Sequence, residues 1–221
     1  MLTAIQVFRD ITSVTETVIS AGITDKENRP SMKKEGKIDI IGISGADDIS
    51  SALKNLPYEN SYDIITTNKF YNFIFADGGI IQMIYLFDKG CIWKHKLAYY
   101  PSPKFESFQN ESEYYMEDCI YLEVLDRRIL PVPIRFDYDN SPETYKELHH
   151  PKSHLTLGQY KNCRIPVCSP VTPSQFVEFI LRSFYNTALI NFSNIIKFQD
   201  HNFNQTATKL EMDRIHIRLK P

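Results

Sequence analysis

The sequence predicts an α+β fold, in which an antiparallel sheet meander is packed by an N-terminal helix and a C-terminal helix. Three observations carry this prediction: an apolar stripe with helical spacing over residues 2–20, three aromatic-rich runs over residues 70–100, and a capped helical pattern that begins at Thr172. The chain has no internal repeats or low-complexity linkers. We therefore expect one domain over residues 1–221, with a subdivision into 1–130 and 131–221 left open.

The first part of the chain predicts a helix, a loop and a strand in that order. Residues 25–37 hold five basic and three acidic side chains without apolar periodicity, which predicts an exposed loop. Residues 38–43 are β-branched and apolar, which predicts a strand, and a short helix is expected over residues 49–55. Gly22 stands where the first helix would stop. The apolar stripe of that helix consists of Leu2, Ile5, Phe8, Ile11, Val14 and Val18.

Residues 70–100 give the clearest signal for a sheet. Three runs rich in Phe and Tyr are separated by Asp-Gly-Gly and Asp-Lys-Gly, which are typical hairpin turns. The same aromatic residues would suit a platform on which bases stack. A sheet covered on one face accounts for them as well, and the meander is the prediction.

The last part of the chain predicts a second helix and a final strand. Thr172 suits the cap and Pro173 the first turn of a helix whose apolar residues recur every three or four positions. Residues 201–205 are rich in Asn, Gln and His and predict a loop. Apolar and polar residues alternate over residues 212–219, which predicts a strand.

The composition is that of an ordinary globular protein. Hydrophobic residues make up 43% and charged residues 24% of the 221 residues, which argues against both a disordered chain and a membrane protein. Residues 2–22 lack the pattern of an export signal, so we expect a cytoplasmic protein with reduced thiols at its four cysteines and no membrane partner.

Charge is unevenly distributed along the chain. Residues 1–144 hold 15 basic and 22 acidic side chains, whereas residues 145–221 hold 10 and 5. Residues 105–126 alone hold seven acidic residues and no basic one. This sorting fits an anionic partner for the C-terminal part, a contact between the two halves, or a solvated surface without a partner.

Residues 131–158 form the candidate site. With strand periodicity over 131–139, Arg135, Asp137 and Asp139 share one face and the apolar residues between them share the other. Two carboxylates at this spacing can raise each other's pKa or share a divalent cation, and the arginine favours their ionised forms. The alternative is an ordinary charged surface.

A histidine-rich segment follows at residues 149–158. Pro151 favours an extended backbone at His150. If residues 153–158 form a strand, His154, Thr156 and Gly158 share a face, and the glycine leaves room for a ligand or phosphate to approach.

Metal binding is an alternative use of these residues. His150, His154, Cys163 and Cys168 are suitable ligand types for zinc, although their spacing matches no standard finger. We expect no cofactor, with a divalent metal as the alternative. Such a metal would be held by Asp137, Asp139 and His150.

Cleavage of RNA without a metal fits these histidine, arginine and aspartate residues better than other hydrolytic mechanisms. His150 and His154 would serve as proton acceptor and proton donor for the 2′-hydroxyl and the leaving 5′-oxygen, and Arg135 or Arg164 would stabilise charge on phosphorus. Asp137 would orient a histidine and fix its tautomer. A Ser-His-Asp hydrolase built on Ser153 lacks the expected G-x-S-x-G context. The residues expected to bind substrate are Tyr138, Asp139, Lys152, Ser153, Thr156, Gly158 and Arg164.

Several strings resemble a known group of proteins. RFDYD at residues 135–139, HPKSHLTLG at 150–158, CRIP at 163–166, the pair Thr172-Pro173 and FVEFILRSFY at 176–185 resemble an uncharacterised bacterial family of domains of unknown function. The order of FDYDN, a His-rich segment and a short helix is also similar to TumE-type toxin components. That likeness implies a prokaryotic α+β protein of a defence or mobile-element setting, although this chain has a long N-terminal half that small toxins lack.

The leading hypothesis is an RNA endonuclease of bacterial toxin or phage-defence type, with His150, His154, Arg135 and Asp137 as catalytic residues. Its partner would be nucleic acid, with a protein partner such as an antitoxin as a further expectation. The alternative is a non-catalytic partner subunit of a defence or toxin-antitoxin complex, in which the same cluster stabilises the fold. A third hypothesis is a metal-dependent nuclease.

Overall fold

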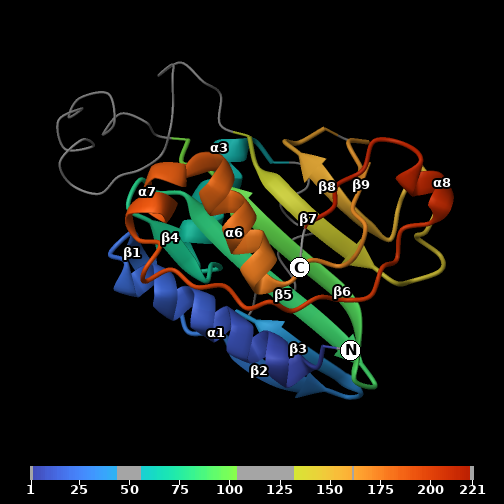
Figure 1. Cartoon of the computed structure of the whole chain (residues 1–221), viewed down its shortest axis with the longest axis horizontal. Coiled ribbons are helices and arrows are strands. Elements are labelled where there is room, and N and C mark those ends of the chain that lie inside the picture. Colours follow the sequence, from blue (N-terminus) through green and yellow to red (C-terminus); the bar gives the residue numbers. More distant parts are fainter. Residues whose placement is uncertain (1, 44–55, 104–131, 161, 220–221) are drawn as a thin grey trace.

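An antiparallel sheet forms the centre of the molecule in the computed structural model, which describes residues 2–43, 56–103, 132–160 and 162–219 (Figure 1). Seven strands follow the order β1-β4-β5-β6-β7-β8-β9, β3 also pairs with β5, and β2 pairs with β3. The predicted α+β fold with an antiparallel sheet is confirmed. The nine strands of the described residues are β1 (Thr24–Glu27), β2 (Ser31–Glu35), β3 (Ile38–Gly42), β4 (Phe73–Phe75), β5 (Ile80–Asp88), β6 (Cys91–Tyr100), β7 (Ile134–Asp139), β8 (Ser153–Leu157) and β9 (Ile165–Pro166).

Two helices pack on one face of the sheet and against each other (Figure 1). They are the predicted N-terminal and C-terminal helices, α1 (Ala4–Ser20) and α6 (Pro173–Phe184). On the opposite face α3 (Tyr58–Thr67) packs through Ile65 against Ile74 and Ile80. The short helices α7 (Asn186–Asn191) and α8 (Lys209–Met212) lie in the C-terminal part.

Local sequence explains where α1 begins and which side it buries. The Thr3 hydroxyl accepts from the Gln6 backbone N–H while the Gln6 side chain accepts from the Thr3 N–H, so two free donors of the first turn are satisfied. Ile11, Val14 and Val18 of the predicted stripe face the core and are at most 1% exposed. The predicted Ile5 is instead 52% exposed, and Val7, which the stripe did not include, is fully buried.

The start of α6 is fixed in the same way and is also bound to α1. Thr172 and Gln175 form a second reciprocal cap, with Pro173 in the first turn. The carboxylate of Asp10, on α1, accepts from the Ser174 backbone N–H at 3.2 Å and from the Ser174 hydroxyl at 2.5 Å. A negative charge is favourable at a helix N-terminus, so this contact stabilises the packing of the two helices.

The meander is present where the sequence predicts it. Lys89 and Gly90, with φ values of 49° and 79°, form the two-residue turn between β5 and β6, as the primed hairpin turns require. On the helix-covered face, Phe136 of β7 contacts Phe176 and Phe179 of α6 edge-on, with ring centroids 6.0 and 5.3 Å apart. These contacts fix β7 beneath α6.

Two predictions of local structure are wrong. Residues 25–37 contain β1 and β2 rather than only a loop, because their backbones pair with β4 and β3 despite the polar side chains. Residues 212–219 contain no regular strand: α8 ends at Met212, and Ile217 makes one isolated bridge to Val167. The adjacent strand β9 is only two residues long and includes Pro166, so it offers little backbone to pair with. The predicted helix at 49–55 and the acidic segment at 105–126 lie outside the described residues.

A buried histidine joins the sheet to the segment before α6. His95 is 1% exposed, its Nε2 accepts from the Val171 backbone N–H at 3.0 Å, and its Nδ1 lies 3.2 Å from the Phe136 carbonyl oxygen. Because an N–H points at Nε2, the proton of the neutral ring is on Nδ1, which donates to Phe136. Burial lowers the pKa of His95 to about 3, against the smaller opposing effect of the Phe136 hydrogen bond.

We predict that His95 makes stability depend on pH below neutrality. Below an unfolded-state pKa of about 6.5 the unfolded chain binds a proton here that the folded chain does not, so stability falls with acidification by up to about 1.4 kcal/mol per pH unit. His95→Phe should lower stability at pH 7 and also flatten this slope, as measured by urea unfolding at several values between pH 7 and 5. His149→Phe, at an exposed position, should leave the slope unchanged. An equally steep slope in His95→Phe would contradict this assignment.

Candidate functional site

The register of β7 and β8 brings the two predicted polar faces together. Asp137 lies opposite His154, and Arg135 lies opposite Thr156. Side chains directly opposite each other in paired strands point to the same side of the sheet. This side is the reverse of the face that α6 covers, because Phe136, between Arg135 and Asp137, packs on α6.

His154 is buried and held in one tautomer. Its Nδ1 lies 3.0 Å from the Pro151 carbonyl oxygen, which can only accept, so Nδ1 carries the proton and Nε2 has a free lone pair. Burial lowers the pKa of His154, while the nearby carboxylate of Asp137 acts in the opposite direction. The ring is therefore neutral at pH 7, and Nε2 is a proton acceptor.

His150 shares this arrangement and is more accessible. Its Nδ1 lies 2.6 Å from the Thr144 carbonyl oxygen, which again leaves Nε2 for other partners. The rings of His150 and His154 meet edge to face with centroids 5.1 Å apart. Lys146 and His150 bridge a tight turn in which Leu148 has a φ of 63°, an uncommon value for a residue with a side chain. This strained turn presents His150 to His154.

Asp137 lies between two positively charged or protonatable groups. Its Oδ2 is 3.9 Å from an Arg135 guanidinium nitrogen and 3.9 Å from Nε2 of His154, distances too long for direct hydrogen bonds. The predicted role of Asp137 in fixing the histidine tautomer is not what the geometry shows, because the Pro151 carbonyl holds Nδ1. Asp137 instead faces Nε2, where it favours the protonated ring.

Asp139 has a structural role at the end of β7. Its carboxylate accepts from the Ser141 backbone N–H at 2.9 Å and from Lys94 Nζ at 3.1 Å. Although burial raises the pKa of Asp139, these hydrogen bonds bring it below its usual value. Within the part of the chain that the structure describes, no group of three or more His, Cys, Asp or Glu residues is placed to hold a metal ion. Neither the Asp137/Asp139/His150 site nor the zinc site gains support from this geometry.

Two residues expected to bind substrate lie on the face of the sheet opposite to Asp137 and His154. Tyr138 and Ser153 are 5% and 3% exposed and lie opposite each other on the core side of β7 and β8. The Ser153 hydroxyl donates to the Ser169 carbonyl, so it is not a nucleophile beside His154. The reason is strand alternation, which turns these side chains away from Asp137 and His154.

The other residues expected to bind substrate differ in how close and how exposed they are at the histidine pair. Thr156 is on the same face but only 4% exposed, and Gly158 follows β8 with a φ of 61°. Lys152 donates to the Asn140 side chain at 2.9 Å. The charge of Arg164 is close enough to His154 to lower its pKa, after the larger effects of burial and of His150. Arg164 is thus a basic residue near the pair.

Comparison with known proteins identifies the family. Residues 23–219 match the family described as Uncharacterized conserved protein (DUF2290). The chain belongs to this family. The predicted resemblance to an uncharacterised family of domains of unknown function is confirmed, and the match includes the described site residues. No curated protein and no solved structure matches this DUF2290 chain significantly. The likeness to TumE-type toxin components stays a prediction.

Three residues of β6 extend the polar face of this DUF2290 member and were not predicted. Lys94 and Lys96 lie opposite Asp139 and Asp137 in the register. Burial raises the pKa of Tyr100 to about 12, and the charges of Arg135 and Asp137 also act on it, which places its hydroxyl near this pair. The alternation of lysines in WKHKLAYY was the available signal, but only the β6–β7 pairing shows which strand they join.

The described part of this DUF2290 chain contains no helix long and apolar enough to cross a membrane.

We predict that Asp137→Asn lowers the pKa of His154 further, because the carboxylate is the main group that favours its protonated form. The titration of the His154 ring, followed by NMR, measures this shift directly. Asp139→Asn is the matched control on the same face of the same strand, and it should leave the His154 titration in place. Equal shifts in both variants would show that the Asp137 contact is not specific.

Proposed function

We propose that this DUF2290 member is an RNA endonuclease of bacterial toxin or defence type that acts in the cytoplasm by acid–base catalysis without a metal. The pairing of His150 and His154 carries the proposal. Their rings are in contact, both Nδ1 atoms are held by backbone carbonyls, and both Nε2 atoms are left for proton transfer.

The residues suggest a division of roles. Nε2 of His154, neutral at pH 7, takes the proton of the 2′-hydroxyl, whose oxygen then attacks the adjacent phosphorus. His150, protonated on Nε2, gives its proton to the departing 5′-oxygen. The products are a 2′,3′-cyclic phosphate and a free 5′-hydroxyl, with His154 protonated and His150 neutral at the end of the step.

Charged neighbours would assist both parts of this reaction. Arg135, whose side chain is 37% exposed, and Arg164 would stabilise negative charge on the phosphoryl oxygens. Asp137 would stabilise the imidazolium of His154, since its Oδ2 already faces Nε2 at 3.9 Å. The 22% exposure of Asp137 gives the substrate an approach to this side of the buried ring.

A second candidate function is a non-catalytic partner subunit of a defence or toxin-antitoxin complex. The burial of His154, which is only 5% exposed, favours this alternative, because a ring held by Pro151 and packed under His150 also stabilises the fold. In that case the protein would act by docking a protein partner, and the histidine cluster would only stabilise the fold.

The test is cleavage of a labelled RNA and of the same sequence as DNA, both in EDTA. We expect RNA cleavage with a cyclic phosphate product, no DNA cleavage, and rate losses of roughly 10²- to 10⁴-fold in His150→Gln and His154→Gln. His149→Gln, an exposed neighbour, should retain full activity.

Each other outcome has a definite meaning. Activity that requires a divalent metal would move the assignment to a metal-dependent nuclease. Absence of cleavage by the wild-type protein, together with a lower melting temperature of His154→Gln, would favour the partner subunit. Cleavage that both histidine variants retain would remove the proposed mechanism.

The pH dependence of cleavage gives a further prediction. Because burial lowers the pKa of the proposed base His154, the acidic limb of kcat/KM should lie below the ordinary histidine value of about 6.5. In Asp137→Asn the acidic limb should move to still lower pH, because the variant lacks the carboxylate that favours the protonated form of His154. An acidic limb above the ordinary value would rule out His154 as the base.

A further inference from the structure

The turn that carries His150 is bound from outside by the start of α8. This turn, residues 140–152, joins β7 to β8, and α8 lies beside it (Figure 1). The Thr208 hydroxyl, at the cap of α8, donates to the Glu147 carboxylate at 2.7 Å. The two residues are 61 positions apart in the sequence. This contact therefore fixes the turn to a distant segment of the chain.

A second residue of the turn faces the same helix cap. Partial burial raises the pKa of Tyr145, and the carboxylates of Glu211 and Glu147 raise it further, which places the Tyr145 hydroxyl near both of them. Glu211 is 1% exposed, and its carboxylate accepts from the Thr208 backbone N–H at 3.0 Å. The cap of α8 thus lies against two residues of the turn, Tyr145 and Glu147.

These two residues alternate along the chain with the two that hold His150. The Thr144 carbonyl oxygen lies 2.6 Å from Nδ1 of His150. The Lys146 backbone N–H donates to the His150 carbonyl at 3.1 Å, and the Lys146 carbonyl accepts from the His150 N–H at 2.6 Å. Thr144 and Lys146 are direct neighbours in the chain of the residues that face α8, which are Tyr145 and Glu147. A change at the α8 contact is therefore passed to His150 over very few bonds.

The C-terminal segment itself has a fixed place beside the sheet. Before α8, the backbone N–H groups of Thr206 and Ala207 donate to the Cys168 carbonyl at 2.9 and 3.1 Å. After α8, the Ile217 N–H donates to the Pro166 carbonyl at 2.8 Å. Pro166 belongs to β9, which pairs with β8. The strand that carries one histidine of the pair is thus connected, through β9, to the segment that binds the turn of the other.

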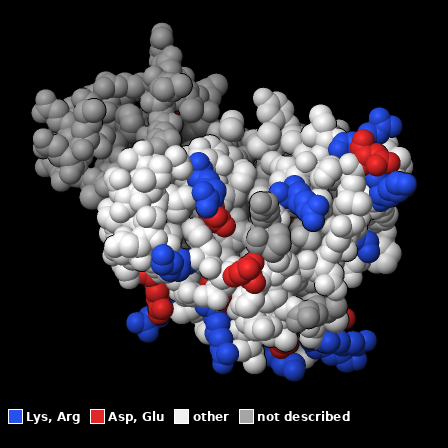
Figure 2. All heavy atoms as spheres, in the orientation of Figure 1, with Lys and Arg blue, Asp and Glu red and all other residues white. Residues whose placement is uncertain are grey.

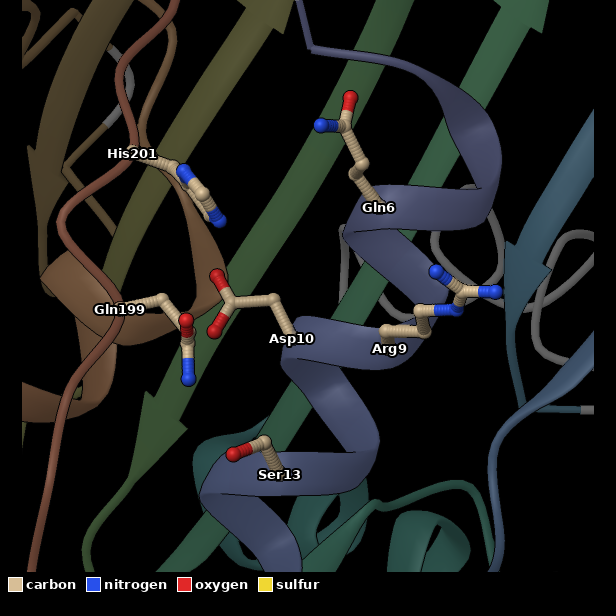
Figure 3. Close-up of a pocket in the computed structure, with 6 residues that line it drawn as sticks. All are labelled: Gln6, Arg9, Asp10, Ser13, Gln199 and His201. Carbon is tan, nitrogen blue, oxygen red and sulfur yellow. The ribbon is translucent and has the colours of Figure 1, made fainter.

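Surface charge does not give α8 a role in binding RNA. On the face in Figure 2, acidic and basic side chains lie together over α8, and the described residues form no continuous basic band there. A phosphate backbone is attracted by such a band. Before it reaches α8, the segment crosses α1, where Gln199 and His201 line a hollow beside Asp10 (Figure 3). The contact with the turn is therefore the feature that links the C-terminal segment to the histidine pair.

We propose that the capped start of α8 positions His150 for proton transfer, with Glu147 and Thr208 as positioning residues. This inference rests on the proposed RNA cleavage, in which His150 gives its proton to the departing 5′-oxygen. Proton transfer depends steeply on the placement of the donor, and a displacement of about 1 Å can cost about 10²-fold in rate. His154 is held by β8 and by the Pro151 carbonyl, so its place does not depend on this contact.

The test compares cleavage of the labelled RNA by the full wild-type chain and by Glu147→Ala. Glu147 is exposed, so the variant should fold, and it lacks the acceptor of the Thr208 hydroxyl. We expect kcat to fall roughly 10- to 100-fold while KM stays within about twofold, because the residues proposed to contact phosphate are unchanged. Glu143→Ala, at an exposed glutamate of the same turn, is the matched control and should keep the wild-type kcat.

Variants of Thr208 separate this contact from the helix cap. Thr208→Asp keeps a good capping residue but replaces the hydroxyl donor by a carboxylate that repels Glu147, so it should lower kcat as Glu147→Ala does. Thr208→Ser keeps the hydroxyl and should retain the wild-type kcat. Thr206→Val is a further control, because the buried Thr206 hydroxyl has no hydrogen-bond partner among the described residues. Its loss should leave kcat unchanged.

The contact between the two rings gives a readout that does not need cleavage. The rings of His150 and His154, with centroids 5.1 Å apart, should show nuclear Overhauser cross peaks in the wild type. These should weaken in Glu147→Ala and Thr208→Asp and persist in Glu143→Ala. Unchanged cross peaks or an unchanged kcat in both of the first two variants would overturn the inference, even if the melting temperature falls. If the wild type cleaves no RNA, the proposed function fails, and the cross peaks alone decide whether α8 places His150.

Discussion

The pairing of β7 with its neighbours is the constraint on which both the core and the candidate site depend. Side chains alternate along a strand, so the register that packs Phe136 against α6 also turns Arg135 and Asp137 to the opposite face. A shift of one residue would exchange the two faces. The hydrogen bonds that bury the aromatic core therefore also place Asp137 opposite His154.

Backbone carbonyls set the chemistry of three histidines in this protein. Those of Thr144, Pro151 and Phe136 accept from the Nδ1 atoms of His150, His154 and His95, respectively. The role of each ring depends on the group that faces its Nε2 atom. In His95 that atom accepts from the Val171 N–H and is fully used, so the ring is structural. In the other two rings the contact at Nδ1 leaves Nε2 for other partners, and Nε2 of His154 faces Asp137 at 3.9 Å.

Buried polar contacts also join the helices to the sheet. Asp10 places a carboxylate at the N-terminus of α6, and His95 binds the segment just before that helix. Each group is buried at a cost that its hydrogen bonds offset. Asp10 anchors α6 and also lines a hollow between α1 and the C-terminal segment.

Local patterns in the sequence determined α1, α6, the meander and the alternation of β7, because caps, turn residues and periodicity act between close neighbours in the chain. They also determined that His154 and Asp137 would lie on polar strand faces. Strand alternation also separated Tyr138 and Ser153 from these faces. Only the tertiary structure decided that the two polar faces meet and that Lys96 joins them from β6. It likewise decided that residues 25–37 pair as strands and that Asp10 reaches Ser174. These outcomes depend on contacts between residues far apart in sequence, which no local pattern encodes.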